Sequence, residues 1–84
     1  MLVEKKVPNV YRHHAVLDAA AAPFTNTAGR LIVSEYAESM DWWFSLKRQN
    51  GSMLRAVLPI EGRMRSDIDL VKVIRDGLTA MLAA

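Results

Sequence analysis

The sequence predicts an α+β fold: an N-terminal helix, a three-stranded antiparallel sheet, and a C-terminal helix packed on one face of the sheet. Three patterns support this order. They are a helical stretch that ends at Pro23, two β-rich runs around Asn50-Gly51, and a long helical stripe after Ser66. Apolar residues make up 51% of the 84 residues, which is enough for one hydrophobic core. We therefore expect residues 1–84 to form a single domain.

Residues 10–22 have the pattern of a short helix. Asn9 can cap its start and Pro23 ends it. Four side chains fall on one side at helical spacing: Val10, His14, Leu17 and Ala21. The preceding residues 2–7 are too few for their alternation to decide between a short strand and a loose arm.

A β-hairpin is predicted from residue 42 to residue 60, with Asn50-Gly51 at its tip. A two-residue loop would mix apolar and charged side chains on both faces of the hairpin. A three-residue loop, with Gly51 in the left-handed conformation, separates them and is therefore predicted. The pairs that it brings together are Leu46 with Leu54, Phe44 with Ala56, Trp42 with Leu58 and Met40 with Ile60.

A third strand is predicted over Leu31 to Tyr36, which is rich in apolar and β-branched residues. An all-α alternative stays open here, because residues 31–48 also place their apolar side chains on one face at helical spacing. We favour strands, since a helix would leave Trp42 and Leu46 exposed.

The C-terminal helix is the most strongly marked element. Ser66 is placed to cap it, with Asp69 three residues later as in a capping box. Its apolar stripe consists of Leu70, Val71, Ile74, Leu78, Met81 and Leu82. This stripe is expected to pack on the inner face of the sheet.

The order of helix, three strands and helix resembles that of double-stranded RNA-binding domains. In that family the last helix opens with a lysine cluster that contacts phosphates. Here the corresponding stretch reads Arg-Ser-Asp-Ile-Asp-Leu, with Asp67 and Asp69 in place of the positive charge. The resemblance covers the layout of the elements and not the residues that bind RNA.

Several classes of function are excluded or disfavoured by the residue types. The chain has no cysteine, which excludes disulfides and thiolate metal sites. His14 shares a helix side with Asp18, a spacing that can bring two metal ligands together. No third ligand is found at a matching spacing, and His13 does not supply one. The four glycines are isolated, and no serine sits in a glycine-framed elbow. We therefore predict no metal, no cofactor and no enzymatic activity.

The location and charge of the chain lead to further expectations. The first ten residues contain no apolar stretch of signal-peptide length, and no segment has the length of a membrane span, so we expect a cytoplasmic protein without a membrane partner. The formal net charge is +2, which does not demand a polyanionic partner.

The candidate binding residues lie on the side of the hairpin that faces away from the predicted core. Trp43, Met53 and Val57 alternate there with charged side chains, and tryptophan beside arginine is typical of interface hot spots. The full predicted set is Trp43, Lys47, Arg48, Met53, Arg55 and Val57. In the alternative arrangement, the N-terminal helix or arm folds over this face and makes Trp43 part of the core.

These observations favour a small non-enzymatic protein-binding module, an inhibitor or adaptor that occupies a surface of a larger protein or complex. The inhibitors that phages use against host defences, such as anti-CRISPR proteins, are an example of this class. A homodimer formed through the sheet is a further possibility. The alternative is a nucleic-acid-binding domain in which Trp43, Lys47, Arg48 and Arg55 form a stacking and phosphate-binding platform.

Overall fold

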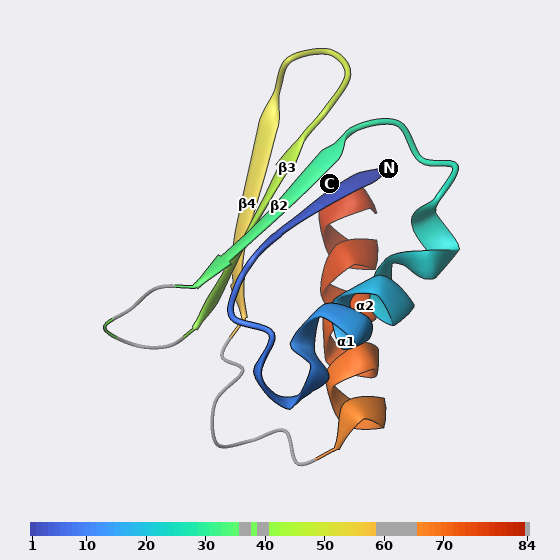
Figure 1. Cartoon of the computed structure of the whole chain (residues 1–84). Helices are drawn as coiled ribbons and strands as arrows, with labels where there is room; N and C mark the ends of the chain where they lie inside the picture. Colours follow the sequence, from blue (N-terminus) through green and yellow to red (C-terminus); the bar gives the residue numbers. More distant parts are fainter. Residues whose placement is uncertain (36–37, 39–40, 59–65, 84) are drawn as a thin grey trace.

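The computed structural model describes residues 1–35, 38, 41–58 and 66–83, which form a mixed four-stranded sheet with two helices on one face (Figure 1). The strands lie side by side in chain order, with β1 parallel to β2 and the other neighbours antiparallel. The elements are β1 (Leu2–Lys6), the 3₁₀ turn η1 (Val10–Arg12), α1 (His13–Ala21), the 3₁₀ turn η2 (Ala22–Phe24), β2 (Arg30–Glu35), β3 (Trp42–Lys47), β4 (Met53–Leu58) and α2 (Asp67–Ala83).

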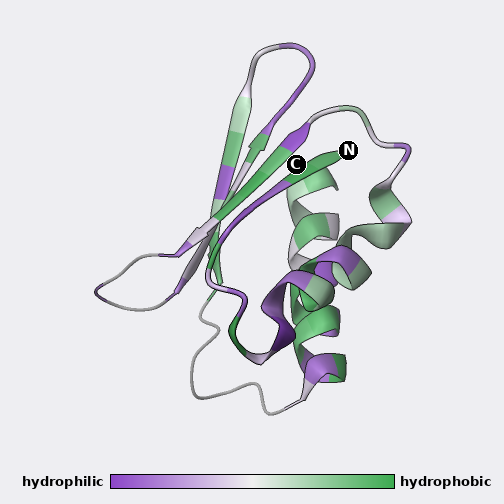
Figure 2. Cartoon of the chain, in the orientation of Figure 1, coloured by the Kyte–Doolittle hydropathy of each residue, from purple (hydrophilic) through white to green (hydrophobic). Residues whose placement is uncertain are grey.

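The core lies between the sheet and the two helices. Figure 2 shows hydrophobic segments, coloured green, on the strands and on both helices. Alternate residues of β2 and β3 point inward, as the period of two in a strand requires. The largest fully buried side chains are those of Trp42, Phe44, Leu17, Leu31, Leu46, Ile74, Leu78 and Val33. The α+β class and the packing of the C-terminal helix on the sheet are therefore confirmed.

The predicted hairpin register is confirmed. Leu46 pairs with Leu54, Phe44 with Ala56 and Trp42 with Leu58, as the three-residue loop requires. At the tip, Arg48 N–H donates to the carbonyl of Ser52 at 2.8 Å, and Gly51 has a φ of +89°. The predicted pair of residues 40 and 60 lies outside the described residues.

The helical alternative for residues 31–48 is wrong, because β2 and β3 occupy most of this range. The pairing of Leu31 with Leu46 and of Val33 with Phe44 buries apolar side chains of both strands on one face. In a single helix over these residues, Trp42 and Leu46 would lie outside the apolar stripe and would stay exposed. Residue 36, the predicted end of the third strand, lies outside the described residues.

The predicted count of three strands is wrong, since β1 adds a fourth. It pairs in parallel with β2, so that Val3 lies beside Leu31 and Lys5 beside Val33. Leu2 N–H also donates to the carbonyl of Gly29 at 3.2 Å. Parallel neighbours need a crossover connection, and α1 provides it.

The N-terminal helix starts later than predicted, at His13. Tyr11 and Arg12 have φ values of 54° and 61°, so the chain turns there before α1 begins. This turn leaves Val10 exposed, and the buried side of α1 consists of Val16, Leu17, Ala20 and Ala21. The N-cap residue of α1 is Arg12, whose side chain makes no capping hydrogen bond, but Asn9 Oδ1 accepts a hydrogen bond from His14 N–H in the first turn at 3.2 Å.

The helix α2 begins and packs as its sequence predicts. Ser66 Oγ accepts a hydrogen bond from Asp69 N–H at 3.2 Å, and Leu70, Ile74, Leu78 and Met81 are buried. Val71 and Leu82 are partly buried against the same core. Within the described part of the chain, neither helix is long and apolar enough to cross a membrane.

Candidate binding face on the sheet

The side of the sheet opposite the helices is covered by no element of the described residues (Figure 1). We call this side the outer face. The strand residues that project from it are Leu2, Glu4 and Lys6 of β1, Arg30, Ile32 and Ser34 of β2, Trp43, Ser45 and Lys47 of β3, and Met53, Arg55 and Val57 of β4. Neither α1 nor the N-terminal strand folds over Trp43, so the arrangement in which Trp43 belongs to the core is wrong.

Exposed apolar side chains gather on the hairpin half of the outer face. Trp43 is 38% exposed and lies directly opposite Val57, which is 47% exposed. Hydrogen-bonded and non-hydrogen-bonded pairs alternate along the two strands, starting from the hydrogen bond between Arg48 and Ser52. By this alternation Trp43 and Val57 form a non-hydrogen-bonded pair, the type in which facing side chains approach most closely. Trp43 and Val57 thus form one continuous apolar corner, while Met53 lies at the other end of β4.

The charges of the outer face are predominantly positive. Its strand residues include the basic Lys6, Arg30, Lys47 and Arg55 and one acidic residue, Glu4. Glu4 forms an ion pair with Arg30 and lies 3.8 Å from Lys6 Nζ. No ion pair of Lys47 or Arg55 is found in the described part of the chain.

Lys47 and Arg55 are diagonal neighbours on adjacent strands, because Lys47 pairs with Met53 and Arg55 with Ser45. Such diagonal neighbours lie within reach of one another's long side chains. The result is a local pair of cations bordered by Met53 on one side and Trp43 on the other. A partner would have to supply the negative charge that neutralises this pair.

Five of the six predicted binding residues come together on the outer face, namely Trp43, Lys47, Met53, Arg55 and Val57. Arg48 lies at the hairpin tip, where its backbone closes the loop and its side chain is half-buried. Ile32 and Arg30 of β2 lie beside these residues on the outer face and are not among the predicted set. Both residues point to the outer face because they alternate along β2 with Leu31 and Val33, which are buried on the inner face and pair with β3.

The histidines have structural roles. His14 Nε2 donates to the carbonyl of Val7 at 2.7 Å, and Asp18 is held by Lys5 at 2.6 Å instead of pairing with His14. The ring of His13 packs edge-on against Trp42, with 4.8 Å between ring centroids. Among the described residues, no group of three His, Asp or Glu side chains could hold a metal ion.

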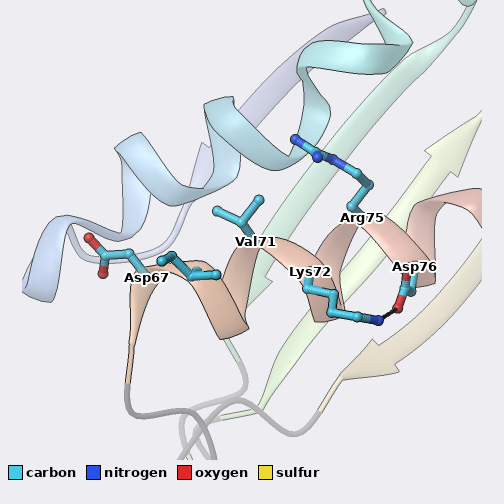
Figure 3. A pocket seen from close by; sticks show the side chains of 6 residues that line it. Asp67, Val71, Lys72, Arg75 and Asp76 are labelled. Atoms are coloured by element: carbon cyan, nitrogen blue, oxygen red, sulfur yellow. Dashed lines mark hydrogen bonds and ion pairs between the residues drawn. The ribbon is translucent and has the colours of Figure 1, made fainter.

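A groove of about 340 Å³ lies along the first half of α2, and its lining residues are Asp67, Ile68, Val71, Lys72, Arg75 and Asp76 (Figure 3). Its charged groups are occupied. Lys72 Nζ lies 2.7 Å from Asp76 Oδ2, and this hydrogen bond raises the pKa of Lys72. Arg75 points away toward α1 and donates to the carbonyl of Ala19 at 2.7 Å. These groups form no nucleophile and base pair, so the groove does not suggest catalysis.

Comparison with protein-family models, with curated proteins and with solved structures finds no match to this chain.

Proposed function

We propose that this protein is a non-enzymatic protein-binding module that acts as an inhibitor or adaptor by occupying a surface of a larger protein or complex. The observation that carries the proposal is the apolar corner of Trp43 and Val57 on a sheet face that no described element covers. Exposed tryptophan and arginine with apolar neighbours are typical of the residues that dominate binding energy. The cytoplasmic location expected from the sequence is part of this proposal.

The charges on the outer face indicate the chemistry of the partner. Arg55 and Lys47 have no ion pair in the described part of the chain, and both border the exposed apolar side chains. A complementary surface would present carboxylates beside apolar groups, because unlike charges across an interface favour encounter and register. Inhibition or bridging would follow from steric coverage of that surface, without chemistry on this chain.

The test compares wild-type protein with a Trp43→Thr variant and a matched control, Ile68→Thr. Ile68 is 81% exposed at the start of α2, away from the outer face. A partner captured by the wild type is purified and titrated against all three proteins by calorimetry. We expect Trp43→Thr to weaken binding by at least about tenfold, as for a hot-spot residue, and Ile68→Thr to leave it unchanged. Equal affinity for all three proteins would contradict the proposal.

A second candidate function is single-stranded nucleic-acid binding. Its supporting observation is the surplus of basic side chains around Trp43 on the outer face, since a stacking ring within a positive field is what such ligands require. A labelled single-stranded oligonucleotide of mixed sequence distinguishes the two functions. Binding that weakens steeply with added salt and is lost in Trp43→Thr would favour nucleic acid over a protein partner.

A further inference from the structure

We propose that the free edge of β4 accepts an extended segment of the partner protein as a fifth strand, with a carboxylate of that segment beside Arg55 and apolar side chains beside Met53 and Val57. This inference rests on the proposed function, because it states how the partner engages the hairpin half of the outer face. It also adds backbone hydrogen bonds, which contacts to the outer face alone would lack.

The hairpin register determines which backbone groups point to the free edge. Arg48 and Ser52 form a hydrogen-bonded pair, and hydrogen-bonded and non-hydrogen-bonded pairs alternate along antiparallel strands. The N–H and C=O groups of Met53, Arg55 and Val57 therefore point away from β3. In the described part of the chain, β4 has no strand on that side. The edge thus presents three donors and three acceptors in a row.

The two edges of the sheet differ in how well they are protected. Three of the five residues of β1 are charged, and Lys5 is tied to Asp18 of α1. Charged side chains on an edge strand discourage strand addition. One of the six residues of β4 is charged, and two of its outer-face side chains are exposed and apolar. β4 is therefore the edge that favours an added strand.

The inner side of β4 is also incompletely covered. Leu54, Ala56 and Leu58 face α2 and are only half-buried, whereas their partners in β3 are fully buried. Among the described strands, β3 has a neighbour on both sides and β4 has a neighbour on one side, which accounts for the difference. A fifth strand would cover these side chains as β4 covers those of β3.

The outer-face side chains of β4 specify the occupant. Met53, Arg55 and Val57 alternate as apolar, basic and apolar, and residues directly opposite one another on neighbouring strands interact most strongly. A complementary strand carries an acidic residue between two apolar ones at the same period of two. Nucleic acid cannot supply the peptide groups that continue the ladder.

A second copy of this chain is a poor occupant. Antiparallel pairing of two β4 strands keeps outer-face residues opposite one another, so Arg55 of one copy would face Met53, Arg55 or Val57 of the other. None of these carries a carboxylate. Charge complementarity therefore favours a segment from a different protein.

The experiment titrates ¹⁵N-labelled protein with the synthetic peptide acetyl-Ser-Val-Thr-Glu-Thr-Val-Ser-amide and follows amide shifts and hydrogen exchange by NMR. We expect shifts along β4 and slower exchange at the amides of Met53, Arg55 and Val57. A matched peptide with lysine in place of glutamate is expected to bind about two- to fivefold more weakly, the range for exposed charge pairs. Methylation of the peptide's backbone nitrogens is expected to abolish the protection.

A charge exchange on the protein side completes the test. Arg55→Glu is expected to reverse the preference between the two peptides. Lys6→Glu makes the same charge reversal on the opposite edge strand and is expected to leave the preference intact. Unchanged exchange at the three amides with either peptide, or binding that survives backbone methylation, would overturn strand addition. If the exchange protection of these amides increased with the concentration of the protein alone, a second copy and not a different protein would occupy the β4 edge. The Trp43→Thr comparison decides separately whether the outer face binds a partner.

Discussion

Two neighbouring residues, Trp42 and Trp43, have opposite environments because a strand turns successive side chains to opposite faces. Trp42 is 1% exposed and packs between the ring of His13 and the neighbouring Phe44. Trp43 lies on the outer face opposite Val57. The same residue type is therefore part of the core at one position and part of the outer face at the next.

Replacing these two tryptophans is expected to separate stability from binding. Trp42→Ala should cost about 3 to 5 kcal/mol of unfolding free energy, because it leaves a large cavity in the core. Trp43→Thr should cost about 1 kcal/mol or less, since its side chain is partly exposed and threonine suits a strand. Urea denaturation followed by circular dichroism measures both. Similar losses for the two variants would contradict the assignment of Trp43 to the outer face.

Alanine substitutions at the two glycines with positive φ are expected to lower the unfolding free energy by different amounts. Gly51 has a φ of +89° in open space, whereas a Cβ on Gly29, at φ +125°, would lie 2.9 Å from the carbonyl oxygen of Lys47. Gly51→Ala is therefore expected to cost about 1 kcal/mol from backbone strain alone. Gly29→Ala should cost more than about 2 kcal/mol, because the clash adds to the strain. Equal denaturation midpoints for the two variants would disagree with this geometry.

At the scale of the elements, the sequence predicts those whose signals are local. The hairpin register follows from Asn50-Gly51 together with the sorting of apolar and charged side chains, and α2 follows from Ser66 and its apolar stripe. β1 could not be assigned, because its five residues alternate too briefly. Its parallel pairing with β2 depends on α1 crossing the sheet, which is a tertiary arrangement and not a local pattern.

The same distinction applies to the candidate site. The outer-face residues of the hairpin were identified because register alone determines which side each one takes. Their exposure could not be derived, since it depends on where α1 packs. The left-handed pair Tyr11 and Arg12, which redirects the chain into α1, consists of residue types that give no sign of a positive φ.

Arg75, which no sequence pattern indicates, links α2 to α1 in addition to the apolar side chains that both helices bury in the core. Its guanidinium donates to the carbonyls of Ala19 and Ala20, near the end of α1. Arg75→Met should lower the unfolding free energy by about 1 to 2 kcal/mol, because charged donors at helix ends make the stronger hydrogen bonds. Urea denaturation provides the measurement.

Arg12→Met is the matched control. Arg12 also links the two helices, but its Nη1 lies 3.7 Å from Asp67 Oδ2 in a largely exposed pair. Such pairs contribute little, so we expect a change below about 0.5 kcal/mol. A loss as large as that of Arg75→Met would show that the carbonyl contacts are not what joins the helices.

At the scale of the whole molecule, the described residues form two layers, a sheet and a pair of helices, and within them the sheet is covered on one face. A domain of this length buries only about 60 to 65% of its unfolded surface, so additional burial by a partner has a large effect on its stability. The outer face carries four basic strand residues and one acidic one, so two copies stacked face to face would repel. This surplus of positive charge is why the partner we propose is a different protein with a complementary surface.

The surplus of positive charge on the outer face predicts how the melting temperature responds to the concentrations of the protein itself and of a partner. Raising the concentration of the protein alone should leave Tm unchanged, because the β4 edge offers no carboxylate to a second copy and the single carboxylate among the outer-face strand residues, that of Glu4, is already paired with Arg30. A partner at about a hundred times its Kd should add about 2.7 kcal/mol, which corresponds to about 10 to 20 °C for a domain of this size. Differential scanning calorimetry measures both series on the same sample. A Tm that climbs with the concentration of the protein alone would instead mean that the chain covers its exposed sheet with a copy of itself, and Arg55→Glu would then be expected to alter that climb.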